Sequence, residues 1–148
     1  MIPRRNRRAV AALEFALVAP VLLMLFGGMA DLGIAMWVRG TLTEAVSQGA
    51  YYAFLTGPSV TASNIQSLVT KASGITGVTA TVSAPATYCA AGTPATLTAT
   101  PSNSTCADGS TPGTYTTISA NYTVPAVLPV LTSLGSVKLQ EDATVRLQ

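Results

Sequence analysis

Glu14 is the residue whose chemistry ordinary packing explains least well. It lies just before residues 15–30, which are sixteen positions without a charge. A carboxylate inside a membrane segment costs a few kcal/mol unless it is paired or close to the interface, so such residues are functional candidates by default. The competing interpretation places Glu14 at the interface, early in a helix, where the helix dipole favours negative charge. The residues alone leave both interpretations open.

Cys89 and Cys106 are the only cysteines of the chain and the second candidates for chemistry. A reactive thiol needs an activating neighbour, and the chain has neither a histidine nor a CxxC spacing. Two cysteines are also too few for a four-thiolate zinc site. We therefore expect a structural disulfide that closes the loop between them, which the loop-entropy model values at about 3 kcal/mol.

The composition excludes several classes of function. Charged residues make up 9% of the 148 residues, and the formal net charge is +2. So small a charge cannot form the basic stripe of a nucleic-acid-binding protein, and without histidine the commonest general base and metal ligand is missing. Glu141 and Asp142 are neighbours on an expected strand, so they point to opposite faces and form no carboxylate pair. We expect no enzymatic activity, no metal and no cofactor.

A membrane-spanning helix is the element that would position Glu14. The apolar stretch over residues 9–38 exceeds the roughly 20 residues that a bilayer requires. Arginines at positions 4, 5, 7 and 8 flank one end, and Trp37 stands near the other, as the positive-inside rule and the aromatic belt predict. We expect a single span at about residues 13–38. The N-terminus would then be cytoplasmic and the C-terminal body would lie in the oxidising periplasm, where a disulfide persists.

A cleaved signal peptide is the alternative interpretation of the same stretch. Residues 28–30 (GMA) would serve as its small-residue cleavage site, and cleavage after Ala30 would release a secreted or periplasmic binding domain. The carboxylate of Glu14 between the arginines and the apolar run argues against it. So does the apolar pattern, which continues past Ala30 to Val38.

Helical spacing continues beyond the span as an amphipathic stem. Apolar residues recur there at three- and four-residue steps, on a face made of Val38, Leu42, Ala45, Val46, Gly49, Ala53 and Phe54. Gly57 and Pro58 end this helix. A second short helix is predicted over residues 63–73, with Ser63 as its N-cap and Gly74 after its end.

The C-terminal part changes to a period of two. Apolar and polar residues alternate over 77–84, 117–124 and 137–148, with Glu141 as the one break in the last segment. Such alternation predicts an antiparallel sheet of about three to four strands with one face against the stem helix. A loop over 85–113 would hold both cysteines, and a second loop over 125–135 would pack on the sheet or face a partner. The fold class is α+β, with a leader at 1–9, a transmembrane and stem helix at 10–56 and a periplasmic domain at 57–148.

The N-terminal sequence resembles the TadE-like family of the tight-adherence, or Flp-type, type IV pilus machinery. The resemblance covers about residues 7–55 and is carried by Arg7, Arg8, Ala11–Val18, Pro20, Phe26, Gly27, Asp31–Gly33 and Ala45–Ala53. It implies a minor pilin or pseudopilin, anchored by a single pass in the bacterial inner membrane or incorporated in the pilus, that assists pilus assembly. Its partners would be other pilin-like subunits, inner-membrane assembly components and a prepilin peptidase.

The same resemblance implies roles for single residues. A prepilin peptidase would cut between Ala9 and Val10, five residues before Glu14, which Phe15 follows. Ala9 stands where the family's usual residue is glycine. The new amine of Val10 would then lie one helical turn from Glu14 and could pair with it within a chain or between neighbouring helices.

Three further residues suit packing between helices. Ala12 and Ala16 form a small-xxx-small pair that lets helix backbones approach closely. Pro20 frees the carbonyl of Ala16 from its hydrogen bond and so permits a bend.

Overall fold

The computed structural model describes residues 4–92, 95–125 and 136–147, with the side chains of residues 4–8 left aside. The chain divides into two compact units, one containing residues 1–37 and 124–137 and the other residues 38–123 and 138–148. Apart from residue 125, the predicted loop over 125–135 lies outside the described residues, so its expected packing on the sheet or against a partner stays a prediction.

Helix α1 runs without interruption from Arg4 to Thr56, so the predicted continuation of the apolar helix into a stem is confirmed. It ends where predicted, at the 3-10 turn η1 (Gly57–Ser59), because Gly57 takes a φ of 66° that side-chain-bearing residues avoid. The helix also begins earlier than residue 10, since Arg4 already belongs to it.

Helix α2 (Ala62–Ser73) confirms the second predicted helix to within one residue. Its N-cap is Thr61 rather than the predicted Ser63, and no side chain caps its first turn. Gly74 follows its end in the left-handed conformation, with a φ of 60°, as the C-cap position requires. Ile65 and Val69 are buried on its inner face.

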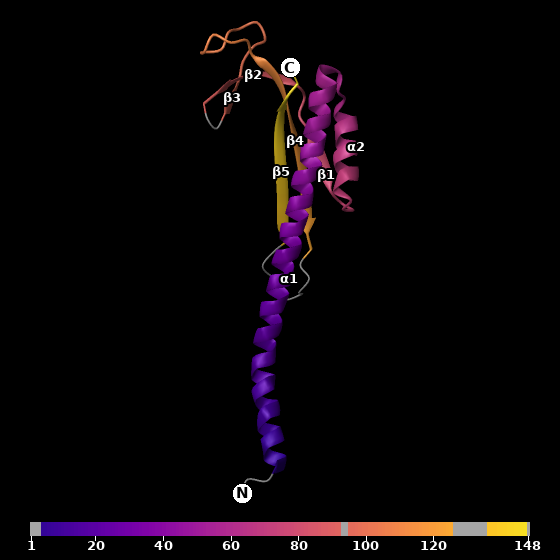
Figure 1. Cartoon of the computed structure of the whole chain (residues 1–148), viewed down its shortest axis with the longest axis vertical. Helices are drawn as coiled ribbons and strands as arrows, with labels where there is room; N and C mark the ends of the chain where they lie inside the picture. The colour runs from indigo at the N-terminus through magenta and orange to yellow at the C-terminus, as the bar shows by residue number, and fades with distance from the viewer. Residues whose placement is uncertain (1–3, 93–94, 126–135, 148) are drawn as a thin grey trace. The chain divides into compact units, whose positions relative to one another are not determined.

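One antiparallel sheet of five strands forms the second layer, with β4 at its centre (Figure 1). The strands are β1 (Thr79–Val82), β2 (Ala86–Ala91), β3 (Thr96–Ala99), β4 (Gly113–Val124) and β5 (Val137–Arg146). Along one edge of β4, residues 118–121 pair with β1 and residues 113–115 pair with β2. Strand β3 pairs in turn with β2. Strand β5 also pairs with β4, and contacts from Leu147 to Thr114 and from Thr144 to Thr117 show that the two run antiparallel.

The hairpin of β2 and β3 corrects the prediction that residues 85–113 form a loop. All four residues of β3 are exposed and no residue of β2 is fully buried. Alternation in a sequence arises only when one face of a strand is buried and the other is wet. This hairpin buries neither face, so its sequence lacks the pattern, and the count of three to four strands becomes five.

The core lies between the sheet and the two helices. Its buried apolar residues are Val38, Leu42, Ala45, Val46 and Ala53 on α1, Ile65 and Val69 on α2, Val78 just before β1, Ile118, Ala120 and Val124 on β4, and Leu147 after β5. The stem helix therefore covers the sheet, and α2 lies beside it (Figure 1). Phe54 was predicted on the buried face, but its side chain is 60% exposed.

Glu141, the one break in the alternation of β5, lies on the helix-facing side of that strand. Its Oε1 accepts a hydrogen bond from Nε of Arg39 at 2.6 Å, which joins β5 to α1 through an ion pair. The Glu141 side chain is 19% exposed and that of Arg39 is 68% exposed. A carboxylate tolerates the half-buried position because the guanidinium of Arg39 compensates its charge.

The predicted disulfide between Cys89 and Cys106 is present and joins β2 to the loop before β4, with the two Cα atoms 5.6 Å apart. A tight turn follows Cys106, in which Asp108 accepts hydrogen bonds from the hydroxyl and the backbone N–H of Ser110. These two bonds, the one from the hydroxyl above all, lower the pKa of the Asp108 carboxyl. The exposed hairpin is thus held by covalent and hydrogen-bonded links rather than by a core of its own.

Gly49 marks the closest approach of α1 to α2, and replacing it with alanine should destabilise the fold. A Cβ atom added there would lie 2.6 Å from Cγ2 of Val69, which is stiff at χ1 and cannot easily move. Overpacking of this kind costs about 1–3 kcal/mol, which exceeds the gain of up to about 1 kcal/mol in helix propensity. We expect Gly49→Ala to lower the urea midpoint of the full-length protein, followed by near-ultraviolet circular dichroism.

Gly40→Ala is the matched control, because nothing lies within 4 Å of the Cβ position at Gly40 in the same helix. It should leave the midpoint unchanged or raise it. Equal midpoints for Gly49→Ala and Gly40→Ala would contradict the close packing of α1 on α2.

The Arg39–Glu141 ion pair should appear as an energetic coupling in a double-mutant cycle of Arg39→Gln and Glu141→Gln. Because Arg39 is largely exposed, the coupling should be small, about 0.2–1 kcal/mol, and should shrink as salt is added. The swapped variant Arg39→Glu/Glu141→Arg should recover stability that either single reversal loses. Additive effects at low salt would show that the two side chains do not interact in solution.

Candidate functional site

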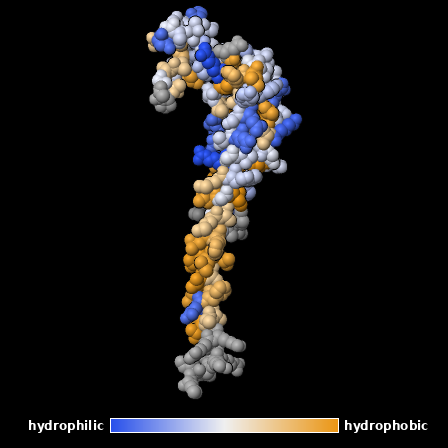
Figure 2. Space-filling view, in the orientation of Figure 1, coloured by the Kyte–Doolittle hydropathy of each residue, from blue (hydrophilic) through white to orange (hydrophobic). Residues whose placement is uncertain are grey.

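The N-terminal segment of α1 is apolar, and most of its described residues are exposed; residues 19, 27, 28, 31 and 35 are half-buried. Side-chain exposures range from 39% at Ile34 to 72% at Leu17 among its large apolar residues. In the space-filling view these side chains cover the narrow helical segment, and the more polar surface belongs to the second unit (Figure 2). By length and composition, α1 is the one helix in the described part of the chain that could cross a membrane, and its most apolar window contains no buried residue.

The four residues of the expected processing site all lie on this exposed segment. Ala9 and Glu14 are exposed, as are Val10 at 54% and Phe15 at 71%. Val10 and Glu14 are four residues apart in a regular helix, so their side chains lie on the same face, one turn from each other. An amine at the nitrogen of Val10 would therefore lie within a turn of the Glu14 carboxylate. In the intact chain this nitrogen belongs to a peptide bond inside the helix.

The residues expected to support helix packing share the same surroundings. Ala12, Ala16 and Pro20 are exposed. Pro20 lies inside α1, with helix assigned on both sides, although it removes the hydrogen bond to the carbonyl of Ala16. The described residues of this chain therefore leave the small-residue surface at Ala12 and Ala16 open to lipid or to another helix.

The amphipathic part of α1 begins at Val38, the first residue of the helix that is buried in the core. Arg39 follows at once and forms the ion pair with Glu141. The exposed apolar segment and the buried stem are thus successive parts of one helix, and the change between them falls within the turn from Trp37 to Arg39. Sequence reasoning had placed Val38 first on the buried face of the stem, which is confirmed, whereas the expected span at about residues 13–38 stays a prediction.

The described residues show no arrangement suited to metal chemistry. They include no group of three or more His, Cys, Asp or Glu side chains able to hold a metal ion. Both cysteines are joined in the disulfide, so neither offers a thiol. Sequence reasoning missed one feature, a polar hollow on the outer face of the sheet, because alternation identifies a wet face without showing that it is concave.

Comparison with curated proteins gives no match, and comparison with solved structures gives none. A match to a family model covers residues 9–50, which include Glu14, Pro20, Arg39 and the first part of the buried stem. The family is described as TadE-like protein, and the match ends six residues before α1 does. The resemblance seen in the N-terminal sequence is thereby confirmed: residues 9–50 of this chain match the TadE-like family model.

Proposed function

We propose that this chain is a membrane-anchored minor pilin or pseudopilin that assists the assembly of a tight-adherence type IV pilus. The match to the TadE-like family model carries the proposal, because it associates the chain with pilus-related membrane proteins in general. It is supported by an apolar helix that fits single-pass membrane anchoring. In this proposal the membrane is the bacterial inner membrane, the N-terminus is cytoplasmic and the second unit lies in the periplasm.

The proposal assigns the assembly role to the exposed helical segment around Glu14. A segment that is apolar on all sides must be surrounded by lipid or by other helices, and Glu14 is its one described carboxylate before Asp31. An ionised carboxylate in lipid is costly, and a cationic partner on an adjacent subunit or at its own N-terminus removes much of that cost. Such a partner would align neighbouring pilin-like subunits along their helices.

The role that we propose is structural rather than catalytic. It needs helix contacts with other pilin-like subunits and with inner-membrane assembly components, and it needs one processing event by a prepilin peptidase between Ala9 and Val10. The absence of histidine from the sequence supports this assignment, since the commonest general base is missing.

Release after Ala30 as a secreted or periplasmic binding domain is the second candidate. One observation is compatible with it: the first residue of α1 that is buried in the core is Val38, so cleavage after Ala30 removes none of the buried core residues. Cleavage after Ala9 spares the core equally. The two candidates therefore differ in the mature N-terminus and in membrane attachment rather than in the stability of the second unit.

Mass spectrometry of the mature N-terminus should find that the protein begins at Val10 and remains in the membrane fraction after an alkaline wash. The exposed apolar helix keeps it there, because burying it in lipid removes that apolar surface from water. A start at residue 31 in the soluble periplasm would replace the pilin-like proposal with the secreted domain. A start at Met1 would refute processing at either site.

Glu14→Gln should insert and accumulate normally, because removing the charge lowers the cost of burial in lipid. Its disulfide should form, yet pilus production and co-purification of partner subunits should fall. Glutamine keeps the size and hydrogen-bonding capacity of glutamate but cannot pair ionically with an amine. Glu14→Asp retains the charge on a shorter side chain, so partial function is expected. Wild-type pilus production by Glu14→Gln would show that the carboxylate only occupies the interface.

A further inference from the structure

The face of the sheet opposite the helices is polar and carries no covering element among the described residues of the second unit. Over much of this face the polar side chains bond one another or the backbone. The hydroxyls of Thr117 and Thr144 lie 3.0 Å apart, and Ser83 Oγ accepts a hydrogen bond from the N–H of Thr117 at 2.8 Å. These groups are satisfied internally and present little that a ligand could use.

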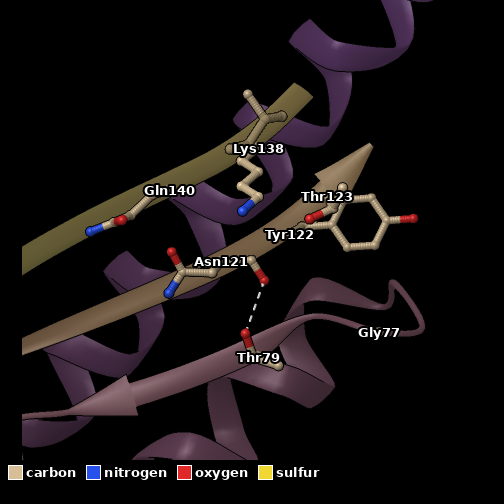
Figure 3. Close-up of a pocket in the computed structure, with 8 residues that line it drawn as sticks. Gly77, Thr79, Asn121, Tyr122, Thr123, Lys138 and Gln140 are labelled. Atoms are coloured by element: carbon tan, nitrogen blue, oxygen red, sulfur yellow. Dashed lines mark hydrogen bonds between the residues drawn. The ribbon is translucent and has the colours of Figure 1, made fainter. Parts of the chain in front are cut away.

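A hollow of about 500 Å³ interrupts this face where β1, β4 and β5 lie side by side (Figure 3). Its polar lining comes from Thr79 on β1, Asn121 and Thr123 on β4, and Lys138 and Gln140 on β5. The Lys138 side chain extends from β5 toward β4 in this view. The volume lies within the range typical of small-molecule sites.

Unlike their neighbours, the polar groups of the hollow have hydrogen-bonding capacity left over. The side-chain amide of Asn121, the hydroxyl of Thr123 and the ammonium of Lys138 bond no described residue. Gln140 donates its amide N–H groups to Asp142 at 3.0–3.1 Å, which leaves its carbonyl oxygen as an acceptor. Thr79 donates to the backbone oxygen of Asn121 at 3.4 Å and retains acceptor capacity.

One end of the hollow is kept open by Gly77, which has a φ of 93°. Any side chain at this position would strain the backbone, and its Cβ would stand 3.7 Å from the Tyr122 ring. The rim is therefore bare backbone beside an aromatic ring. Tyr122 and Leu139 also line the hollow, but they alternate with Asn121 and Lys138 along their strands, so their side chains belong to the helix-facing phase of β4 and β5.

The chemistry of the lining selects among ligand classes. The lining does not favour an anion. Lys138 is the one cation in the lining, and the carboxylate of Asp142, which bonds Gln140, would repel negative charge. The backbone N–H groups of β4 are also engaged, because β4 pairs with neighbouring strands along both edges. An apolar ligand would leave the amide and hydroxyl groups without partners, at a cost for each buried group. A sugar presents neighbouring hydroxyls that both donate and accept hydrogen bonds. The lining offers matching groups on three strands: the amide of Asn121, the hydroxyls of Thr79 and Thr123, the carbonyl oxygen of Gln140 and the ammonium of Lys138.

We propose that this hollow binds one hexose unit of a glycan. Asn121 is the central group, because its amide can donate to one hydroxyl of a vicinal pair and accept from the other. Thr79 and Gln140 on the flanking strands add acceptors. The proposal concerns the second unit alone and does not depend on the role assigned to the N-terminal helix.

A glycan array tests the site with the full-length protein in phosphatidylcholine nanodiscs, since detergents with sugar headgroups would compete. The array carries neutral, N-acetylated and uronic-acid oligosaccharides, and calorimetry then measures Kd for the strongest binder. We expect the wild-type protein to bind at least one class. Asn121→Ala and Thr79→Ala should each weaken that binding about tenfold, which corresponds to about 1.4 kcal/mol.

Ser119→Ala and Thr81→Ala are matched controls, since each lies two residues along the same strand as its counterpart and on the same face, outside the hollow. Both should bind as the wild type does, and circular dichroism with a test for the disulfide confirms that every variant is folded. Lys138→Gln replaces the ammonium with an amide that can still donate a hydrogen bond, so affinity for a neutral sugar should fall by no more than a few-fold, whereas an anion would lose its one cationic partner in the hollow. Absence of binding to every glycan on the array would overturn the proposal, and so would equal affinity of Asn121→Ala and Ser119→Ala for the glycan. A third contrary result would be displacement of the glycan by inorganic phosphate at constant ionic strength together with loss of glycan binding in Lys138→Gln, because that would indicate an anion site.

Discussion

The burial of one face of the stem helix is the constraint on which the rest of the second unit depends. Gly49 of α1 meets Val69 and Ile65 of α2 and Ile118 of β4, so both helices and the central strand converge at one glycine. Ile65, Ile118 and Val69 are almost completely excluded from solvent, as is Leu42 on the same helix as Gly49. Each such side chain contributes about 1.5–3 kcal/mol when it is fully buried. This contact fixes which face of β1, β4 and β5 turns inward.

The two parts of α1 have different surroundings. The large apolar side chains of its first part are exposed, whereas the part after Trp37 buries one stripe of apolar residues against the sheet and α2. The ion pair of Arg39 with Glu141 follows directly after the change. Because the first buried residue of α1 is Val38, the part of the family match from Ala9 to Trp37 contributes no residue to the buried core. The sequence of this part can therefore be adapted to contact with lipid, a peptidase or neighbouring helices.

The side of the sheet opposite the helices is under a weaker constraint. No described element covers it, so its side chains need only be soluble, and threonine and serine satisfy this need while favouring strands. The exposed hairpin of β2 and β3 depends on the Cys89–Cys106 link and on the turn held by Asp108 and Ser110. Against this background the unpaired polar groups around Asn121 stand out, since solubility alone does not require them to gather in a hollow.

The sequence by itself determined the helices and strands that have one side in the core and the other in solvent. The helix from the apolar segment to Gly57, the short helix ending at Gly74 and the inward faces of β1, β4 and β5 could all be predicted, because burial on one side leaves a period that the chain must carry. The disulfide followed from two cysteines without an activating neighbour, and the TadE-like signature followed from residues 7–55. Where the surroundings are uniform, as along β2 and β3, no period arises and the strands were missed.

Only the tertiary structure decided the contacts that join distant residues. It placed Phe54 outside the core, because α2 and the sheet cover a narrower stripe of α1 than the helical period allows. It placed Glu141 against Arg39, which turns an apparent break in a strand pattern into an ion pair. It also gathered Thr79, Asn121 and Lys138 from three strands into one hollow. A local pattern reports how each residue meets solvent, whereas the partner of a side chain depends on strand order and register, which are set by packing across the whole unit.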